Sequence, residues 1–214
     1  MKYIDKKSEP PEFKAWKSKA RKTSPKWKTL RGKVKQKVNE SLLGEQGGLC
    51  CYCEIEVNME RGHIDHLLPQ CAHPECVFEY GNLLYSCPER SKEDMGERDT
   101  EGKVPQTCGH AKGNNILPIT PLDKDCETHF IYTEAGYIFG KTKEASETIL
   151  ILNLNGSQRI CNRRRNIYEE ICECKSILTP DEFDLWINAE LQRKPDGTFK
   201  PFWTTIKYAA GLYT

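Results

Sequence analysis

The sequence of 214 residues lacks the patterns that mark several common protein classes. No apolar run approaches the roughly 20 residues that a membrane-spanning helix needs, and the opening MKYIDKKSEPPEF has no apolar stretch typical of a signal peptide. There is no internal repeat, no Walker motif and no glycine fingerprint for a dinucleotide. These absences argue against membrane, secreted and nucleotide-binding classes. We expect a cytoplasmic protein with one good core, as a single domain or a small domain with an elaborated scaffold.

Net charge is also nearly absent, at +1, but it is unevenly distributed. Residues 1–40 hold 14 Lys and Arg against 4 Asp and Glu, which leaves 18 against 27 in the remainder. A basic arm ahead of an acidic body favours a polyanionic partner or an acidic protein surface, and a solvated lysine-rich tail is an equally good interpretation. Phe13, Trp16 and Trp27 fit partner docking or local core packing better than base stacking. The extended Pro10-Pro11 favours docking of this arm on a protein partner.

Cysteine, in contrast, is abundant, with eleven residues. In a chain without a secretion signal this favours thiols and thiolates over a disulfide framework, and the odd number prevents complete pairing within the chain. Cys50 and Cys53 form a CxxC knuckle that can supply two thiolates to one tetrahedral Zn²⁺. Cys87 and Cys108 are the best second pair. The resulting Cys₄ site is closed, so its predicted role is structural, as a source of folding free energy.

Two alternatives to this ligand set stay open. Either His110 or a cysteine from the CAHPEC loop replaces Cys108 as the fourth ligand. The same loop, with Cys71, His73 and Cys76, is also a weaker candidate for a second metal site, because its spacing is loose and it lies in a loop.

A further group of residues suits the hydrolysis of a phosphodiester bond. Asp65 and His66 are neighbours on an extended segment, so their side chains point to opposite faces. Asp65 and His110 can hold one hard divalent ion, Mg²⁺ or Mn²⁺, while His66 stays off the metal and removes a proton from water near neutral pH. The amide oxygen of Asn82, accepting from the ring N–H of His66, would fix the tautomer of that histidine.

Two outer candidate ligands flank this group. His63 lies two residues before Asp65, on the same face of the expected strand, and Asn114 lies one helical turn after His110. A lone His or Asn in a loop is usually structural. The order DH, then NLLxxC, then CxHxK is much harder to obtain by chance.

The predicted elements give an α+β fold. We expect a helix over 33–43, a hairpin over 130–139, a helix from Ser146, one over 157–178, and a capped helix from Thr179 to about residue 194. The alternation in 54–57 after the knuckle predicts another hairpin. Arg159, Arg163, Arg164 and Arg165 make a predicted basic patch, of which Arg163 to Arg165 can bind phosphate, although an exposed charge run is more often only solvated.

These elements divide into three predicted regions. A basic N-terminal arm and helix occupies 1–43, a zinc-stabilised ββα core occupies 44–123 with a surface insertion at 88–107, and a mainly helical scaffold occupies 124–214.

Several segments together carry a resemblance to a known family: GEQGGLCCYCE, HIDHLLPQ, EYGNLLYSC, CGHAKGN, the opening MKYIDKKSEPPEF, and LNLNGSQR with the arginines after it. The sequence resembles the HNH (ββα-metal, treble-clef) endonucleases, and most of all the HNH subunit of the Septu anti-phage defence system, which also occurs beside some retrons. The resemblance implies metal-dependent cleavage of nucleic acid, with DNA favoured over RNA, and a partner ATPase of the ABC/SMC type.

By this resemblance Asp65 and His66 fall on the DH pair, Asn82 on the middle asparagine and His110 on the last histidine. Two features depart from the family pattern: His63 stands where many such motifs carry an acid, and the insertion splits the second zinc knuckle. The rival interpretation is a zinc-stabilised treble-clef module that binds nucleic acid or protein without cutting. An RNase is a third possibility.

Overall fold

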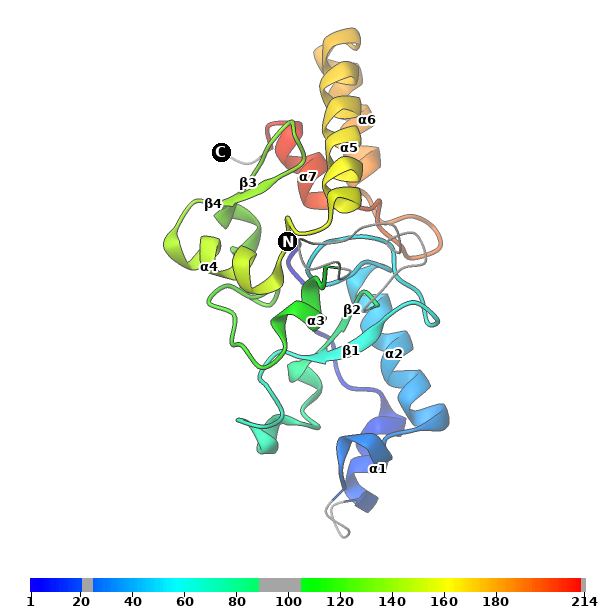
Figure 1. Cartoon of the computed structure of the whole chain (residues 1–214). Helices are drawn as coiled ribbons and strands as arrows, with labels where there is room; N and C mark the ends of the chain where they lie inside the picture. The colour runs from blue at the N-terminus through cyan, green and yellow to red at the C-terminus, as the bar shows by residue number, and fades with distance from the viewer. Residues whose placement is uncertain (21–24, 89–104, 213–214) are drawn as a thin grey trace.

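A computed structural model describes residues 1–20, 25–88 and 105–212, and it shows an α+β protein with helices around two small antiparallel sheets (Figure 1). The helices of the described part are α1 (Pro11–Ala20), α2 (Gly32–Gln46), α3 (Cys108–Lys112), α4 (Lys143–Leu152), α5 (Gln158–Ile177), α6 (Pro180–Leu191) and α7 (Trp203–Ala209). Single 3₁₀ turns lie at Trp27–Thr29, Pro74–Cys76, Tyr80–Asn82 and Cys126–His129. No helix among the described residues is long and apolar enough to cross a membrane.

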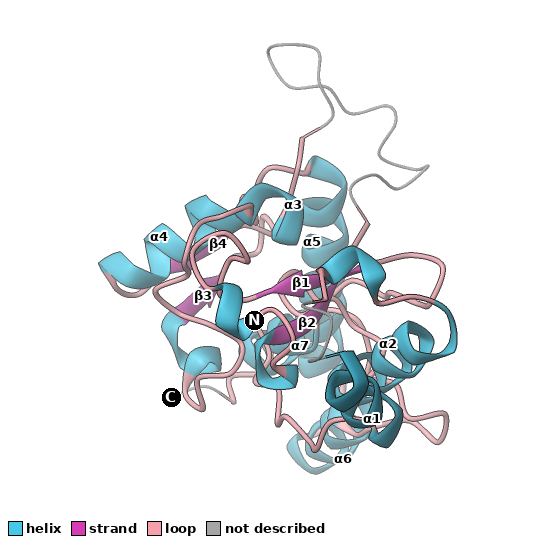
Figure 2. Ribbon diagram, turned by 90° about the horizontal axis from the view of Figure 1, so that it is seen from below, coloured by secondary structure: helices cyan, strands magenta, loops and turns pink. Residues whose placement is uncertain are grey.

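The first sheet lies at the centre of the molecule. Strand β1 (His63–His66) pairs antiparallel with β2 (Leu83–Ser86), with His63 opposite Ser86 and His66 opposite Leu83. Figure 2 shows this hairpin between α3 on one side and α2 on the other. Every residue of β2 is buried, which explains its continuous Leu-Leu-Tyr-Ser run without alternation.

Helix α2 closes the free edge of β2 through one side chain. The Gln46 amide oxygen accepts from Tyr85 N at 2.7 Å, and its nitrogen donates to Tyr85 O at 2.7 Å and to Leu49 O at 2.8 Å. The helix predicted over 33–43 is confirmed and is slightly longer, and Gly47 ends it in the left-handed conformation, with φ 62°.

The second sheet confirms the predicted hairpin. Strand β3 (Phe130–Tyr132) pairs antiparallel with β4 (Ile138–Gly140), and α4 packs on β4. Helix α4 begins three residues before the predicted Ser146, because the Thr142 side chain caps it by accepting from Ala145 N at 3.2 Å.

The C-terminal helices carry a smaller core of their own. Helices α5 and α6 lie side by side as a projecting arm (Figure 1), and the predicted capping box between Thr179 and Glu182 is present. Helix α6 ends at Leu191 rather than near residue 194, and a further helix, α7, begins at Trp203, which the sequence analysis did not predict. Phe202, just before α7, is buried.

The N-terminal segment belongs to the main core. Ile4 N donates to Pro121 O at 2.8 Å, and the Met1 ammonium lies 3.1 Å from a Glu54 carboxylate oxygen. The Phe13 and Trp16 rings stack with centroids 6.1 Å apart, and Trp16 meets the Phe78 ring at 5.2 Å. Of the two favoured interpretations of these aromatics, local core packing is therefore confirmed, while docking of the arm on a partner stays a prediction.

The predicted hairpin after the knuckle was wrong. Residues 54–57 form no strand, and only an isolated bridge joins Leu49 to Glu56. Glu54 takes a left-handed turn at φ 62° that closes the knuckle, and its buried carboxylate accepts from Thr204 N at 2.8 Å and from the Thr204 hydroxyl. In the sequence, the charged Glu54 looks like a solvent-facing position of a strand, although it lies in a buried turn. The apolar-polar alternation of 54–57 therefore predicted a strand that does not form.

The predicted three-region division stays a prediction. The main core contains residues from all three predicted regions, from Met1 to Phe202. Residues 89–104, which make up most of the predicted insertion, lie outside the described part of the chain.

The prediction that four arginines form one basic patch was wrong for Arg164, because only 1% of this residue is exposed. Its guanidinium donates to Gly136 O at 2.6 Å and to Leu154 O at 2.7 Å. The β3–β4 turn approaches α5 so closely that a Cβ on Gly136 would lie 1.9 Å from Cys161 O. Arg164 therefore joins the second sheet to α5 instead of facing solvent.

We expect Arg164→Met to lower the free energy of unfolding by about 3 kcal/mol, since it leaves two buried carbonyls without their donor. Arg164→Lys should recover only part of the loss, because a lysine cannot present the same planar fork. Arg165→Met, on the exposed face of the same helix, should change the value by no more than about 0.5 kcal/mol. Urea unfolding followed by circular dichroism measures all three, and equal midpoints for the variants at 164 and 165 would contradict the assignment.

Candidate metal centre and hydrolytic site

Four buried sulfur atoms meet at one point beside the central hairpin. The Sγ atoms of Cys50, Cys53, Cys87 and Cys108 all lie within 4.8 Å of one another. They come from the knuckle, from the residue after β2 and from the first residue of α3. Four thiolates at this separation and burial are the ligand set of a structural zinc site, so the residues fit the predicted ion.

The surroundings of Cys50 favour a thiolate. Burial alone would raise its pKa, but hydrogen bonds from the neighbouring thiols, Cys108 first, outweigh that effect and hold the pKa of Cys50 well below the ordinary value. The backbone N–H of Cys87 also donates to Cys50 Sγ, at 3.3 Å. Donors around a sulfur are the kind of outer contact that orients and stabilises metal ligands.

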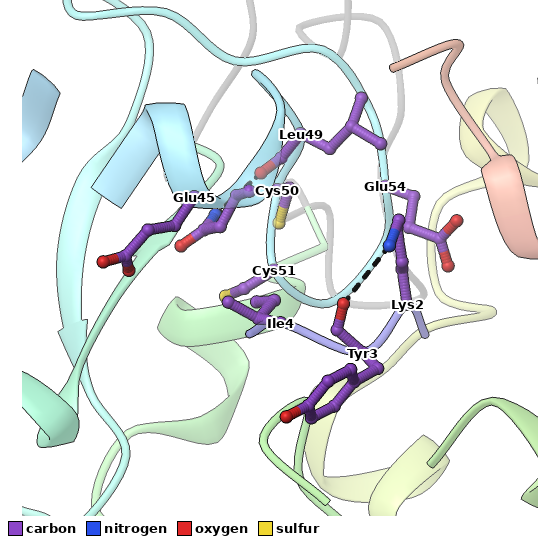
Figure 3. Close-up of a pocket in the computed structure, with 9 residues that line it drawn as sticks. Lys2, Tyr3, Ile4, Glu45, Leu49, Cys50, Cys51 and Glu54 are labelled. Carbon is purple, nitrogen blue, oxygen red and sulfur yellow. Dashed lines mark hydrogen bonds between the residues drawn. The ribbon is translucent and has the colours of Figure 1, made fainter. Parts of the chain in front are cut away.

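The neighbouring Cys51 is not part of the quartet. Burial raises its pKa well above the ordinary value, which is typical of an inert buried thiol. Figure 3 shows Cys51 beside Ile4, at a cavity of about 10 Å³ under the N-terminal segment. That volume holds one water molecule at most, so the cavity is not a ligand site.

The CAHPEC loop does not assemble a second metal centre. Cys71 is exposed, and the His73 ring and Cys76 Sγ each contact the Glu75 carboxylate, at 3.2 and 3.7 Å. Within the described residues, no second group of three or more His, Cys, Asp or Glu has ligand atoms placed to hold a metal ion.

Asp65 lies on β1 and is held by two residues that the sequence analysis missed. Tyr52 donates its hydroxyl hydrogen to Asp65 Oδ2 at 2.6 Å, and the buried Lys112 ammonium lies 3.6 Å from the same oxygen. Burial raises the pKa of Asp65 above its usual range, while Lys112 and Tyr52 act in the opposite direction. Tyr52 follows Cys51 in the segment GEQGGLCCYCE, and Lys112 lies two residues after His110 in CGHAKGN. Their places in these two motifs were the sequence signal that could have identified them.

His63 and His110 come together at the start of α3. Their ring centroids lie 4.1 Å apart. A Cβ placed on Gly109 would lie 2.8 Å from His63 Nε2 and 3.2 Å from Asp65 Cγ. The absence of a side chain at Gly109 therefore lets α3 approach β1 closely enough to gather two imidazoles and a carboxylate.

His66 has a different orienting partner from the predicted one. Its Nε2 lies 3.0 Å from Val77 O, so Nε2 carries the hydrogen and donates it. Its Nδ1 accepts from the Gln70 amide at 3.2 Å, and Trp27 meets the ring edge-on, with centroids 4.4 Å apart. Burial lowers the pKa of His66, and the Lys112 charge lowers it further, so the ring is neutral at pH 7.

The predicted hydrogen bond from the His66 ring N–H to the Asn82 amide oxygen was wrong. The Asn82 amide oxygen accepts from Leu68 N at 2.7 Å, and its nitrogen donates to Leu68 O and Cys76 O, each at 3.1 Å. Because Cys76 precedes Val77, Asn82 acts on His66 indirectly, by fixing the loop that presents the Val77 carbonyl.

Asn114 does not lie near His110 on a helical face. Helix α3 ends at Lys112, Gly113 turns the chain with φ 51°, and Asn114 is exposed. The expected turn of helix beyond His110 is therefore absent.

We expect the purified chain to carry one equivalent of zinc, because the quartet forms one closed tetrahedral site. Cys53→Ser should lose the metal and unfold at a much lower temperature, since the site supplies folding free energy. Cys51→Ser, one residue from the knuckle ligand Cys50 but outside the quartet, should keep its zinc. Mass spectrometry measures the zinc content of each variant, and a thermal melt measures its stability. Zinc retained in Cys53→Ser would contradict the proposed set of four ligands.

Comparison with known proteins gives three relatives, although no family model matches the chain. The "Retron Vc95 putative HNH endonuclease" of Vibrio cholerae serotype O1 biovar El Tor is 32% identical over 144 residues, which are 63% of this chain and 65% of that protein. The Septu protein PtuB of Bacillus thuringiensis is 26% identical over 153 residues, 70% of this chain and 54% of that protein. The Septu protein PtuA of Bacillus mycoides (strain KBAB4) is 26% identical over 163 residues, 68% of this chain and 23% of that protein.

The matched region thus covers less than two thirds of the length of each relative. The names of the relatives agree with the family that the motifs indicated. This chain is a homologue of the protein named "Retron Vc95 putative HNH endonuclease" and of the Septu proteins PtuA and PtuB.

Proposed function

We propose that this chain is a metal-dependent HNH endonuclease that hydrolyses phosphodiester bonds of nucleic acid, DNA in preference to RNA, within an anti-phage defence complex. The observation that carries the proposal is the approach of α3 to β1. It gathers Asp65, His63 and His110 around Gly109, next to the cysteine quartet, from segments far apart in the sequence. A purely structural zinc module has no need of a second group of titratable residues at this place.

The donor set fits a divalent ion. The Asp65 carboxylate is the kind of oxygen ligand that Mg²⁺ and Mn²⁺ prefer, whereas imidazole nitrogens are preferred by borderline ions such as Zn²⁺ and Ni²⁺. Asp65 and His110 would hold the ion, with His63 as the outer candidate. When bound, the ion stabilises the negative charge that develops on the phosphate. Tyr52 and Lys112 both contact Asp65 Oδ2, so they hold the carboxylate in place and leave Oδ1 as the atom for the ion.

His66 is the general base of the proposed reaction. Since Nε2 donates to Val77 O, Nδ1 is the basic atom, and the lowered pKa keeps it unprotonated at neutral pH. Gln70 occupies Nδ1 with a hydrogen bond of 3.2 Å, and a water molecule would exchange with that amide. A fixed tautomer and a neutral ring are what proton removal from water requires.

The proposed partner is an ABC/SMC-type ATPase of the same defence system. The region homologous to this chain is 23% of the PtuA relative, so a related sequence occurs as part of a much longer protein. This similarity to part of a protein named PtuA supports an association of this chain with the PtuA component of the Septu system. The relative named PtuB supports the assignment to the same system.

We expect purified protein to cut labelled nucleic acid with Mg²⁺ or Mn²⁺ and not with EDTA, and we expect duplex DNA to be cut faster than single-stranded DNA or tRNA. His66→Ala should slow cutting by about 10²- to 10⁴-fold, because it removes the base, while zinc content stays unchanged and the melting temperature falls only by the amount expected for one buried carbonyl, Val77 O, that loses its donor. His129→Ala is the matched control, since His129 lies outside the site and pairs with Asp125.

Two results would reject the nuclease. One is cutting that persists in EDTA or in His66→Ala. The other is zinc-loaded protein that binds nucleic acid and never cuts it, with or without the ATPase, which would favour the treble-clef binding module.

We expect an ABC/SMC-type ATPase of a Septu system to co-elute with this chain from a gel-filtration column when the two are expressed together. The same fractions should contain the metal-dependent cutting activity. Separate elution of the two proteins, with cutting unchanged by the presence of the ATPase, would contradict the proposed complex and leave the nuclease itself intact.

A further inference from the structure

A groove lined by arginine lies beside the proposed site. Arg61 comes from the turn before β1, and Arg159 and Arg163 come from the first half of α5. The groove has a volume of about 400 Å³, and Ile55, Glu56, Asn58 and Pro88 complete its lining. Figure 1 shows the cyan loop that leads into β1 beneath the yellow foot of α5, where these two walls meet.

The chain connects this groove directly to the hydrolytic residues. Arg61 lies two residues before His63, whose ring packs on His110 with centroids 4.1 Å apart. On the other strand, Pro88 lies two residues after Ser86, the partner of His63 across the hairpin. Two residues span no more than about 7 Å. The groove therefore begins at the end of the hairpin where the proposed metal ligands gather.

The charge and geometry of the groove suit phosphate. Among the described residues that line the groove, three are arginines and one, Glu56, is acidic. Arg159 and Arg163 are four residues apart and so neighbour each other on one face of α5, while Arg61 stands on the opposite wall. The Arg163 guanidinium also lies over the Phe202 ring, at 5.3 Å, which restricts its position. Guanidinium forks bind phosphate oxygens in pairs, and arginine is the preferred residue for this contact.

A larger groove of about 660 Å³ lies along the N-terminal segment and α2, but its charges serve the fold. Lys7 pairs with Asp5, and Arg193 donates to the carbonyls of Gly44 and Glu45. Lys2 lies over the Phe199 ring at 4.6 Å. The arginine groove is the better candidate for an anionic ligand because three cations converge there on one open volume.

We infer that the arginine groove binds backbone phosphates of the nucleic acid and leads the strand to the Asp65–His66 hairpin. This inference rests on the proposed nuclease function and adds the path of its substrate. Phosphate contacts position a nucleic acid without selecting its sequence. The groove should therefore contribute affinity and orientation equally for all sequences.

The test is the salt dependence of binding to a labelled DNA duplex, followed by fluorescence anisotropy in EDTA so that no cutting occurs. Each phosphate contact contributes about 0.9 to the slope of log affinity against log salt concentration. We expect Arg163→Gln to reduce the slope by about 1, and the double variant Arg159→Gln with Arg163→Gln to reduce it by about 2. Arg61→Gln, on the other wall and outside α5, should reduce it by about 1 independently.

Arg165→Gln is the matched control, with the same charge change on the exposed face of α5, and it should keep the wild-type slope. His66→Ala should also keep it, since the base does not contribute phosphate affinity. Zinc content and melting temperature show that each variant is folded.

The failures can be told apart. If wild-type protein cuts DNA while all groove variants keep its slope, the groove inference is wrong and the nuclease stands. If the groove variants keep the slope but no longer co-elute with the ATPase, the groove is a protein contact and the inference is also wrong. If the wild type neither binds nor cuts nucleic acid, the groove inference and the proposed function both fail.

Discussion

The meeting of four cysteine sulfurs is the constraint on which the arrangement of the site depends. Cys50 and Cys53 lie in the knuckle, Cys87 follows β2 and Cys108 begins α3. A hairpin of two short strands is marginal on its own in water, and a five-residue helix is too short to persist alone. Joining their ends at one buried point positions both elements, and Gly109, the next residue, then lets α3 approach the hairpin. The structural and hydrolytic groups are thus one assembly.

Inside that assembly, charge is balanced by side chains that do no chemistry themselves. The buried Lys112 donates to His66 O at 2.8 Å and lies 3.6 Å from Asp65 Oδ2, so one ammonium joins α3 to both residues of the DH pair. A buried carboxylate without such partners would be costly and would tend to protonate. Tyr52 supplies the second contact from the knuckle. The proposed metal ligand Asp65 and the proposed base His66 are therefore held by elements on both sides of β1.

The sequence predicted the residue types of the site better than their contacts. The cysteine quartet follows from spacing and thiol chemistry, and the helices over 33–43 and 157–178 follow from periodicity and caps. The partner of His66 could not be predicted, because the Val77 backbone carbonyl has no side-chain signature, and the predicted acceptor Asn82 instead holds the loop that carries it. The predictions of a strand that includes Glu54 and of an exposed Arg164 were wrong for a related reason. Sequence patterns place charged residues at the surface, and only the tertiary packing shows that these two side chains are buried.

The contact of Gln46 with β2 has a consequence for self-association. The outer edge of a two-stranded sheet exposes N–H and C=O groups that can pair with a strand from another molecule. Here the Gln46 amide bonds to both groups of Tyr85, at 2.7 Å each, so a helix side chain takes the place of a third strand. The Cys51 N–H also donates to Tyr85 O, at 3.1 Å, so strand addition at that point would have to break these three hydrogen bonds and displace α2. Gln46 and the Cys51 N–H thus protect the central hairpin against edge-to-edge aggregation.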